Sequence, residues 1–195
     1  MPSPKALPNE VRIIGGDWKR TKLPVADKPG LRPTPDRVRE TLFNWLGQDL
    51  SGWRCVDAFA GTGALGLEAA SRGAGQVLLV EQDPDLVSKL RALQQKLSAS
   101  TVTVQRGNGL SVLAQLAPAS VDLIFLDPPF EAKLYDKALK AAAAAIGPDG
   151  WIYLEAPDAW NEAKLQTFEL SLSKHMKAGA VHAHLLSRSG PAPAS

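Results

Sequence analysis

The stretch Val121-Asp122-Leu123-Ile124-Phe125-Leu126-Asp127-Pro128-Pro129-Phe130 decides how this chain can fold. Its first six residues are apolar except for Asp122, which is typical of a buried strand in a parallel sheet. The two prolines cannot continue a strand ladder, so the strand should end at Leu126 and open into a loop. In open α/β sheets, ligands bind beyond the carboxyl ends of the strands. We therefore expect the chemistry of this chain at that loop.

The four residues of the loop could hold a flat ring that carries an amino group. The Asp127 side chain and the Pro128 carbonyl are two acceptors, and the fixed φ angles of Pro128 and Pro129 stiffen the turn. Phe130 adds an aromatic face on which a base can stack. We interpret all four as candidate catalytic residues. The alternative is a structural turn, with the aspartate as a cap and the phenylalanine in the core.

Strands and helices alternate on both sides of this stretch. The pattern predicts strands at 53–58, 76–81, 101–105, 121–126 and 150–155, and helices at about 63–72, 83–97, 109–116 and 134–146. Such alternation predicts a parallel sheet with helices on both faces. Beyond Pro157, alternation at period two over 167–172 and 181–186, with a Gly-containing stretch at 174–179 between them, predicts an antiparallel hairpin at the sheet edge.

The residues before this α/β pattern form a basic N-terminal extension. Val11–Gly16 predicts a short strand with a glycine turn, and a basic loop that carries Trp18 follows it. Thr34 and Pro35 predict the N-cap and first residue of a helix. The expected buried face of that helix consists of Val38, Leu42, Trp45 and Leu46.

Arginines around the start of this helix predict a phosphate-binding edge. Arg37 and Glu40 fall outside the apolar stripe, so Arg32, Arg37 and Arg39 could face a nucleic acid. Basic residues outnumber acidic ones in 1–54 and in 164–195, whereas acidic residues dominate 55–163. This distribution favours a polyanion held by the two ends of the chain. The alternative is an unevenly charged but ordinary surface.

Length and composition favour one soluble domain. The chain has 195 residues, of which 45% are hydrophobic, enough for a sizeable core. We expect a flexible N-terminus at 1–10, the basic extension at 11–50, the α/β domain at 51–188 and a flexible tail at 189–195. No uncharged apolar stretch approaches the about 18 residues of a membrane span, and no export signal is evident. The single Cys55 fits core packing in a reducing cytoplasm.

A glycine turn near the middle of the chain indicates a nucleoside-bearing cofactor. Gly61, Gly63 and Gly66 satisfy the G-x-G-x-x-G pattern between a predicted strand and a predicted helix. Glu81 ends the next strand, where a carboxylate can accept hydrogen bonds from ribose hydroxyls. Asp57 at the strand tip would repel a pyrophosphate and attract a cation. This favours S-adenosylmethionine over NAD, with an NAD-dependent dehydrogenase as the alternative.

Together these residues resemble the class I S-adenosylmethionine-dependent methyltransferases, and within them the RsmD family. The resemblance rests on Arg12–Gly16, Leu31–Thr34, Asp36–Leu46, Phe59–Ala69 and Asp127–Phe130, within a match from about residue 11 to 157. This family consists of bacterial enzymes that methylate the exocyclic N2 of one guanine in 16S ribosomal RNA. The resemblance implies a Rossmann-like class I methyltransferase fold, with a mainly parallel seven-stranded sheet, helices on both faces and a C-terminal antiparallel hairpin. Its expected partner is 16S ribosomal RNA or a small-subunit assembly particle, bound by a cytoplasmic monomer.

The resemblance also implies roles for individual residues. The expected cofactor-binding set is Asp57, Phe59, Ala60, Gly61, Thr62, Gly63, Glu81, Gln82, Asn108 and Asp127. The expected RNA-binding set is Arg12, Trp18, Lys19, Arg20, Arg32, Thr34 and Arg37. We expect no metal, and we interpret His175, His182 and His184 as surface residues of the hairpin. The alternative functions are a DNA adenine-N6 methyltransferase and a non-catalytic RNA-binding or ribosome assembly factor.

Overall fold

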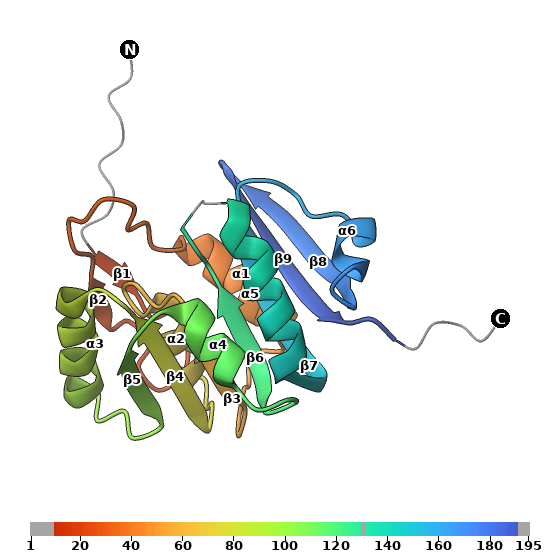
Figure 1. The fold of residues 1–195 in the computed structure, drawn as a ribbon. Coiled ribbons are helices and arrows are strands. Elements are labelled where there is room, and N and C mark those ends of the chain that lie inside the picture. Colours follow the sequence, from red (N-terminus) through yellow and green to blue (C-terminus); the bar gives the residue numbers. More distant parts are fainter. Residues whose placement is uncertain (1–9, 130–131, 191–195) are drawn as a thin grey trace, which may run out of the picture.

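A central sheet of seven strands organises the computed structural model, which describes residues 10–129 and 132–190 (Figure 1). The strand order is β5-β4-β3-β6-β7-β9-β8; β3 to β7 run parallel, and β9 is antiparallel to both of its neighbours. The order reverses between β3 and β6, and such a switch point opens a crevice at the carboxyl ends of the strands. The strands are β3 Arg54–Asp57, β4 Gln76–Glu81, β5 Val102–Arg106, β6 Val121–Leu126, β7 Ile146–Ala156, β8 Leu170–Ala178 and β9 Val181–Arg188.

Helices cover both faces of this sheet. Figure 1 shows α4 and α5 in front of the sheet, with α1 and α2 behind it. Alternate residues of β6 enter the two cores: Leu123 and Phe125 pack on the side of α1 to α3, Ile124 and Leu126 on the side of α4 to α6. Burial on both faces explains why β6 is an almost continuous apolar run. The helices are α1 Asp36–Trp45, α2 Ala64–Ser71, α3 Pro84–Lys96, α4 Gly109–Gln115, α5 Ala132–Ala145 and α6 Glu162–Gln166.

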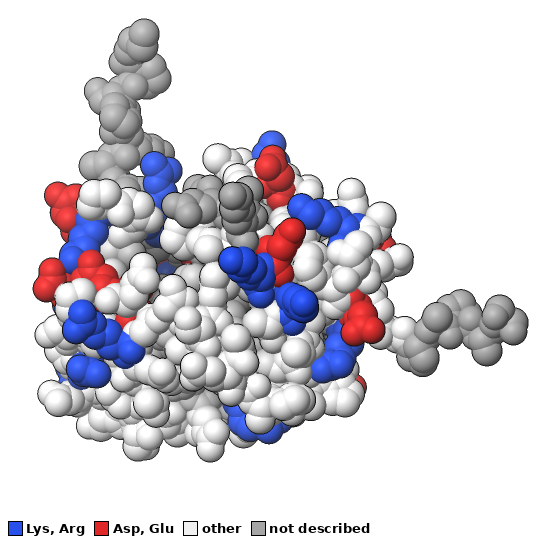
Figure 2. Space-filling model, viewed as in Figure 1, with Lys and Arg blue, Asp and Glu red and all other residues white. Residues whose placement is uncertain are grey.

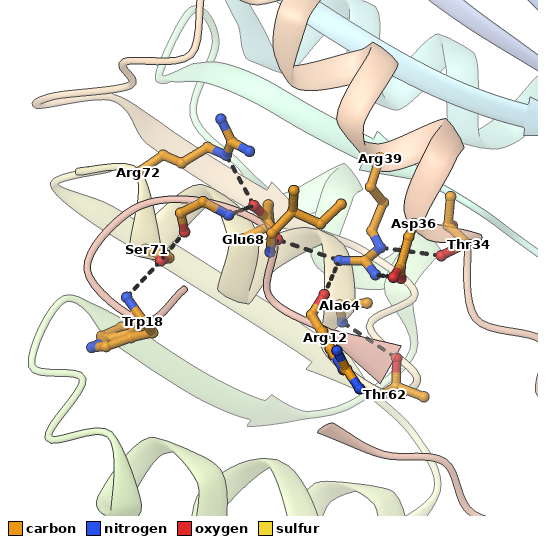
Figure 3. A network of polar contacts seen from close by, with 12 residues as sticks. Arg12, Trp18, Thr34, Asp36, Arg39, Thr62, Ala64, Glu68, Ser71 and Arg72 are labelled. Atoms are coloured by element: carbon orange, nitrogen blue, oxygen red, sulfur yellow. Dashed lines mark hydrogen bonds and ion pairs between the residues drawn. The ribbon is translucent and has the colours of Figure 1, made fainter. Parts of the chain in front are cut away.

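The N-terminal extension is joined to α2 through one buried carboxylate. The extension begins with a hairpin of β1 (Glu10–Arg12) and β2 (Lys22–Pro24). Glu68 of α2 accepts the N–H groups of Ile14 and Gly15, each at 2.9 Å, and forms ion pairs with Arg39 and Arg72 (Figure 3). Arg39 in turn donates to the Arg12 and Thr34 carbonyls. These contacts hold the hairpin, α1 and α2 together around the buried carboxylate.

The structure confirms the expected fold class and the alternation of strands and helices. It also confirms the hairpin at the sheet edge, but the predicted bounds of its first strand were wrong. This strand begins at Leu170, because residues 167–169 form the turn after α6, and it continues to Ala178 through the stretch expected to connect the two strands. Lys174 to Ala178 pair with β9, and the turn is confined to Gly179 and Ala180. None of the helices in the described part of the chain is long and apolar enough to cross a membrane.

Three polar residues lie elsewhere than predicted. Thr34 does not cap α1, whose N-cap is Pro35, because the Thr34 hydroxyl is turned to Glu155 instead. Arg39 cannot face a nucleic acid, because its side chain is fully buried and ion-paired. His184 is not a surface residue: it is buried, accepts the Trp160 N–H at Nε2, and donates from Nδ1 to the Leu154 carbonyl. Burial lowers the pKa of His184 to about 4, so the ring is neutral.

Candidate active site

Three carboxyl groups meet at the carboxyl edge of the sheet, beside the crevice between β3 and β6. In the sheet register, Asp57 of β3 aligns with Phe125 of β6, and Phe125 aligns with Tyr153 of β7. Glu155 stands two residues beyond Tyr153 in β7, so the pleat directs it to the face on which Phe125 and Tyr153 pack, and Asp127 follows the last residue of β6 beside it. The crevice is therefore acidic, as expected for a site that takes a cation.

Asp57 is buried directly beneath the glycine turn. Its side chain is 1% exposed and accepts the Gly66 N–H at 3.0 Å. Burial raises the pKa of Asp57 to about 7, and the charges of Glu81 and Glu155 add to the shift. A positive ligand charge within about 6 Å would favour the ionised form of this carboxyl.

The glycine turn has the shape that a cofactor loop requires. Gly61 and Gly63 have φ angles of 54° and 81°, in the left-handed region that favours glycine. Glu81 supports the turn, because its Oε2 accepts the Gly61 N–H at 2.9 Å while Oε1 accepts the N–H groups of Gln82 and Asp83. A carboxylate has about four acceptor positions, so Glu81 retains capacity for a ribose hydroxyl. Phe59, Ala60 and Thr62, also predicted here, belong to the same turn.

The segment before α1 lies across this turn. A Cβ atom at Gly61 would stand 3.1 Å from the Leu31 side chain. Lys28 is ion-paired with Asp83 at 2.7 Å and with Asp85 at 2.9 Å, both at the start of α3. These contacts connect the basic extension to the glycine turn and to the start of α3, which follows the predicted cofactor residues Glu81 and Gln82.

Asn108 stands at the start of α4, on the other side of the crevice. Its Oδ1 caps the helix by accepting the Ser111 N–H at 3.1 Å, which leaves the amide NH₂ to meet a ligand. The following Gly109 approaches β3 so closely that a Cβ there would stand 2.1 Å from the Ala58 carbonyl oxygen. This close approach brings Asn108 near the strand tip that carries Asp57.

Asp127 is held at the strand tip by its neighbour Glu155. Asp127 follows Leu126, the register partner of Leu154, so it lies beside Glu155, and burial followed by the Glu155 and Asp57 charges raises the pKa of Asp127 well above its usual value. Pro128 is buried and Pro129 is exposed. Phe130, the fourth predicted catalytic residue, lies outside the described residues.

Sequence reasoning missed three residues around Asp127. Glu155 accepts the hydroxyls of Thr34 and Tyr153. The buried Tyr135 hydroxyl of α5 has no hydrogen-bond partner among the residues that the structure describes. Burial and the charges of Asp127 and Glu155 raise the pKa of Tyr135 to about 12. The position of Glu155 could have been predicted from the sequence. It lies at the carboxyl end of the predicted strand 150–155, and the carboxyl ends of parallel strands lie at the same edge of a sheet as Asp127.

The predicted RNA-binding residues fall into two groups. Arg12, Lys19, Arg20, Arg32 and Arg37 have exposed side chains, all in the extension or the first turn of α1. Trp18 is half-buried and packs against the core, and Thr34 is buried. On the face shown in Figure 2, basic and acidic side chains are interspersed, and the surface over α4 is mostly uncharged. This view shows no continuous basic field.

A family model, curated proteins and a solved structure all match this chain over most of its length. The family model described as "Conserved hypothetical protein 95" matches residues 11–187. Ribosomal RNA small subunit methyltransferase D of Escherichia coli (strain K12) is 44% identical over 147 residues, which are 75% of this chain and 72% of that protein. The protein of the same name from Haemophilus influenzae is 39% identical over 171 residues, 81% of this chain and 89% of that protein. The structure of a putative methyltransferase from Escherichia coli, yhhF, superposes with a TM-score of 0.79 at 39% identity, covering 93% of this chain and 99% of the other.

Proposed function

Because this chain belongs to the RsmD family of ribosomal RNA small subunit methyltransferases, we propose that it methylates the exocyclic N2 of a guanine in 16S ribosomal RNA. The methyl donor in this proposal is S-adenosylmethionine, and the partner is 16S ribosomal RNA or a small-subunit particle. The observation that carries the proposal is the position of Asp127. This residue directly follows the last residue of β6 and lies beside the acidic crevice under the glycine turn.

The residues of the crevice suit a nucleoside that carries positive charge. Glu81 would accept from the ribose hydroxyls, and Asn108 would meet the adenine amine. Asp57 would face the charged methionine part, where its carboxylate form is favoured by a neighbouring cation. When bound, the cofactor would supply a methyl group on a positively charged sulfur. The amine nitrogen would form a bond to that methyl carbon while the carbon–sulfur bond breaks, and the neutral thioether would leave.

Asp127 and the Pro128 carbonyl act on the attacking amine. The lone pair of guanine N2 is delocalised into the ring, so the amine is a poor nucleophile. Two acceptors that take both N–H bonds draw the nitrogen towards tetrahedral geometry and stabilise the positive charge that grows on it. No strong base is required, because the proton leaves easily once nitrogen has gained the methyl group.

The target base has to leave its pairing partner before it can reach this corner. An amine inside a duplex is paired, so the guanine is either splayed out or taken from a loop. Phe130 is assigned to stack on the base, a contact worth about 1–3 kcal/mol in proteins that bind single strands. Exposed arginines of the extension, Arg32 and Arg37 among them, would hold the flanking phosphates.

The proposal is tested by offering two polymers to the same protein. The protein is incubated with S-adenosylmethionine labelled in the methyl group and with either small-subunit particles from cells lacking the enzyme or duplex DNA rich in adenine. We expect label in 16S ribosomal RNA and none in DNA. Label in DNA would favour an adenine-N6 methyltransferase, and label in neither polymer would favour a non-catalytic assembly factor.

A further inference from the structure

Glu155 lies directly beside Asp127, although two neighbouring carboxyl groups repel each other when both are ionised. It is the last residue but one of β7, and it is 6% exposed. Leu126 and Leu154 are register partners in parallel strands, so Asp127 and Glu155 are the next residues along and lie side by side. Glu155 is buried and Asp127 is half-buried, and two carboxylates at such short range repel strongly unless a proton or cation lies between them.

The contacts of Glu155 fix its orientation. The Thr34 hydroxyl donates to Glu155 Oε1 at 2.5 Å, and the Tyr153 hydroxyl donates to the same oxygen at 2.7 Å. Two carboxylates that lie side by side at the ends of paired strands repel each other, so the pair favours holding one proton between them. Because the two hydroxyls that donate to Glu155 Oε1 favour the ionised form of Glu155, the proton belongs on Asp127, which then donates to Glu155.

We propose that Glu155 is a positioning residue for Asp127: it accepts a hydrogen bond from the protonated Asp127 carboxyl and thereby aims the other Asp127 oxygen at the target amine. This inference rests on the proposed function, in which Asp127 accepts an N–H of guanine N2. Glu155 does not touch the substrate. Its effect is to make Asp127 a neutral acceptor with one fixed orientation, comparable to an asparagine side chain.

The surrounding charges agree with one shared proton. Burial raises the pKa of Glu155, and burial together with the neighbouring charges raises that of Asp127. The other titratable groups that face the pair are Asp57 from β3, Tyr135 from α5 and Tyr153 from β7. Both tyrosines have a raised pKa and stay protonated through neutral pH, whereas Asp57 titrates near 7. Assays at saturating cofactor keep the titration of Asp57 from dominating the rate.

The test compares Glu155→Ala with Glu155→Gln in methyl transfer to small-subunit particles. Loss of a residue that orients an active-site ligand typically costs about 10- to 100-fold, so we expect Glu155→Ala to lower kcat by that factor. Cofactor affinity, measured by calorimetry, should stay within about threefold. The side-chain amide that the second substitution introduces can donate to an ionised Asp127, so Glu155→Gln should recover most of the lost kcat.

The pH profile separates positioning from a merely structural role. In the wild type, loss of the shared proton at alkaline pH leaves two adjacent carboxylates, so kcat should fall as the pH rises. Glu155→Gln has no such proton to lose, and its profile should be flatter on the alkaline side of neutral pH. The matched control is Glu169→Gln, an exposed carboxylate at the opposite edge of the sheet, which should leave both kcat and the profile unchanged.

Two results would overturn the inference while leaving the proposed function intact. One is an active wild type with a Glu155→Ala variant of unchanged kcat. The other, decisive if Glu155→Ala does not fold, is a Glu155→Gln variant whose alkaline decline matches that of the wild type. An inactive wild type would instead refute the proposed function itself.

Discussion

At the scale of single residues, the proposed mechanism depends on Asp127 as an acceptor. Asp127→Ala removes one of the two oxygens that hold the amine, and we expect single-turnover methyl transfer to slow by about 10²-fold or more. Asp127→Asn keeps an acceptor oxygen and can donate to Glu155, so it should retain far more activity. Rapid-quench measurement at saturating cofactor decides this. Near-normal single turnover in Asp127→Ala would exclude the mechanism.

The raised pKa of Asp57 predicts that cofactor binding depends on pH. Its pKa is raised to about 7, so below that pH the carboxyl is largely protonated and has to lose its proton when a cationic ligand approaches. Binding of S-adenosylmethionine should therefore release up to one proton and strengthen as the pH rises from about 6 to 8, by at most about tenfold per pH unit. Calorimetry in buffers of different ionisation enthalpy measures the released proton. Asp57→Asn should abolish both effects, and a wild-type affinity independent of pH would contradict this role.

Some residues could be predicted from their neighbours in the sequence and others could not. Asp57 and Glu81 were placed by their positions at strand ends, and Asn108 was placed by the family resemblance; Asp57 lies at the end of β3, Glu81 at the end of β4 and Asn108 at the start of α4. The burial of Arg39 could not be predicted, because its partner Glu68 lies on another helix. His184 was misread for the same reason, since the Trp160 N–H that it accepts comes from a distant loop.

At the scale of elements, Glu68 joins the extension to the α/β domain. Glu68→Gln would remove the buried charge that pairs with Arg39 and Arg72, leave Arg39 paired with Asp36, and set an amide NH₂ against backbone donors. Breaking a buried ion pair in this way costs about 3–5 kcal/mol, and we expect that loss in the free energy of unfolding. Urea denaturation measures it. The exposed Glu169→Gln serves as control and should change stability by no more than about 0.5 kcal/mol. A loss of similar size in both variants would contradict the role of Glu68.

The strands and helices were more predictable than their ends. The parallel strands β3, β4 and β6 are recognisable because their apolar runs are largely buried and bounded by turn residues. The first strand of the edge hairpin was misplaced because an edge strand has polar residues on its open side, so Lys174 to Ala178 resemble a loop. Strand β2 was not predicted at all, since three residues carry too little periodicity.

At the scale of the whole molecule, the basic extension and the acidic crevice have different proposed roles. We propose that residues 11–50 bind RNA and that residues 51–188 carry out methyl transfer. Arg32→Ala and Arg37→Ala should each weaken RNA binding and reduce the slope of log K against log salt by about 1. Filter binding at several salt concentrations measures that slope.

The chain offers a matched control for these arginines. Arg54 is also exposed, but it stands at the amino end of β3, on the edge opposite the crevice, where it pairs with Asp122 at 3.0 Å. Arg54→Ala should leave the salt slope unchanged. If Arg32→Ala and Arg37→Ala also leave it unchanged, both arginines are ordinary surface residues and the RNA is held elsewhere.

The proposed mechanism requires two fixed oxygen acceptors at the β6 tip to deliver a guanine amine to a methyl donor. Digestion of the 16S ribosomal RNA labelled by the wild-type protein, followed by mass spectrometry of the labelled nucleoside, tests this requirement. We expect a single N2-methylguanosine at one position in the RNA sequence. Label on a ring nitrogen, on ribose or on any base other than guanine would contradict the mechanism.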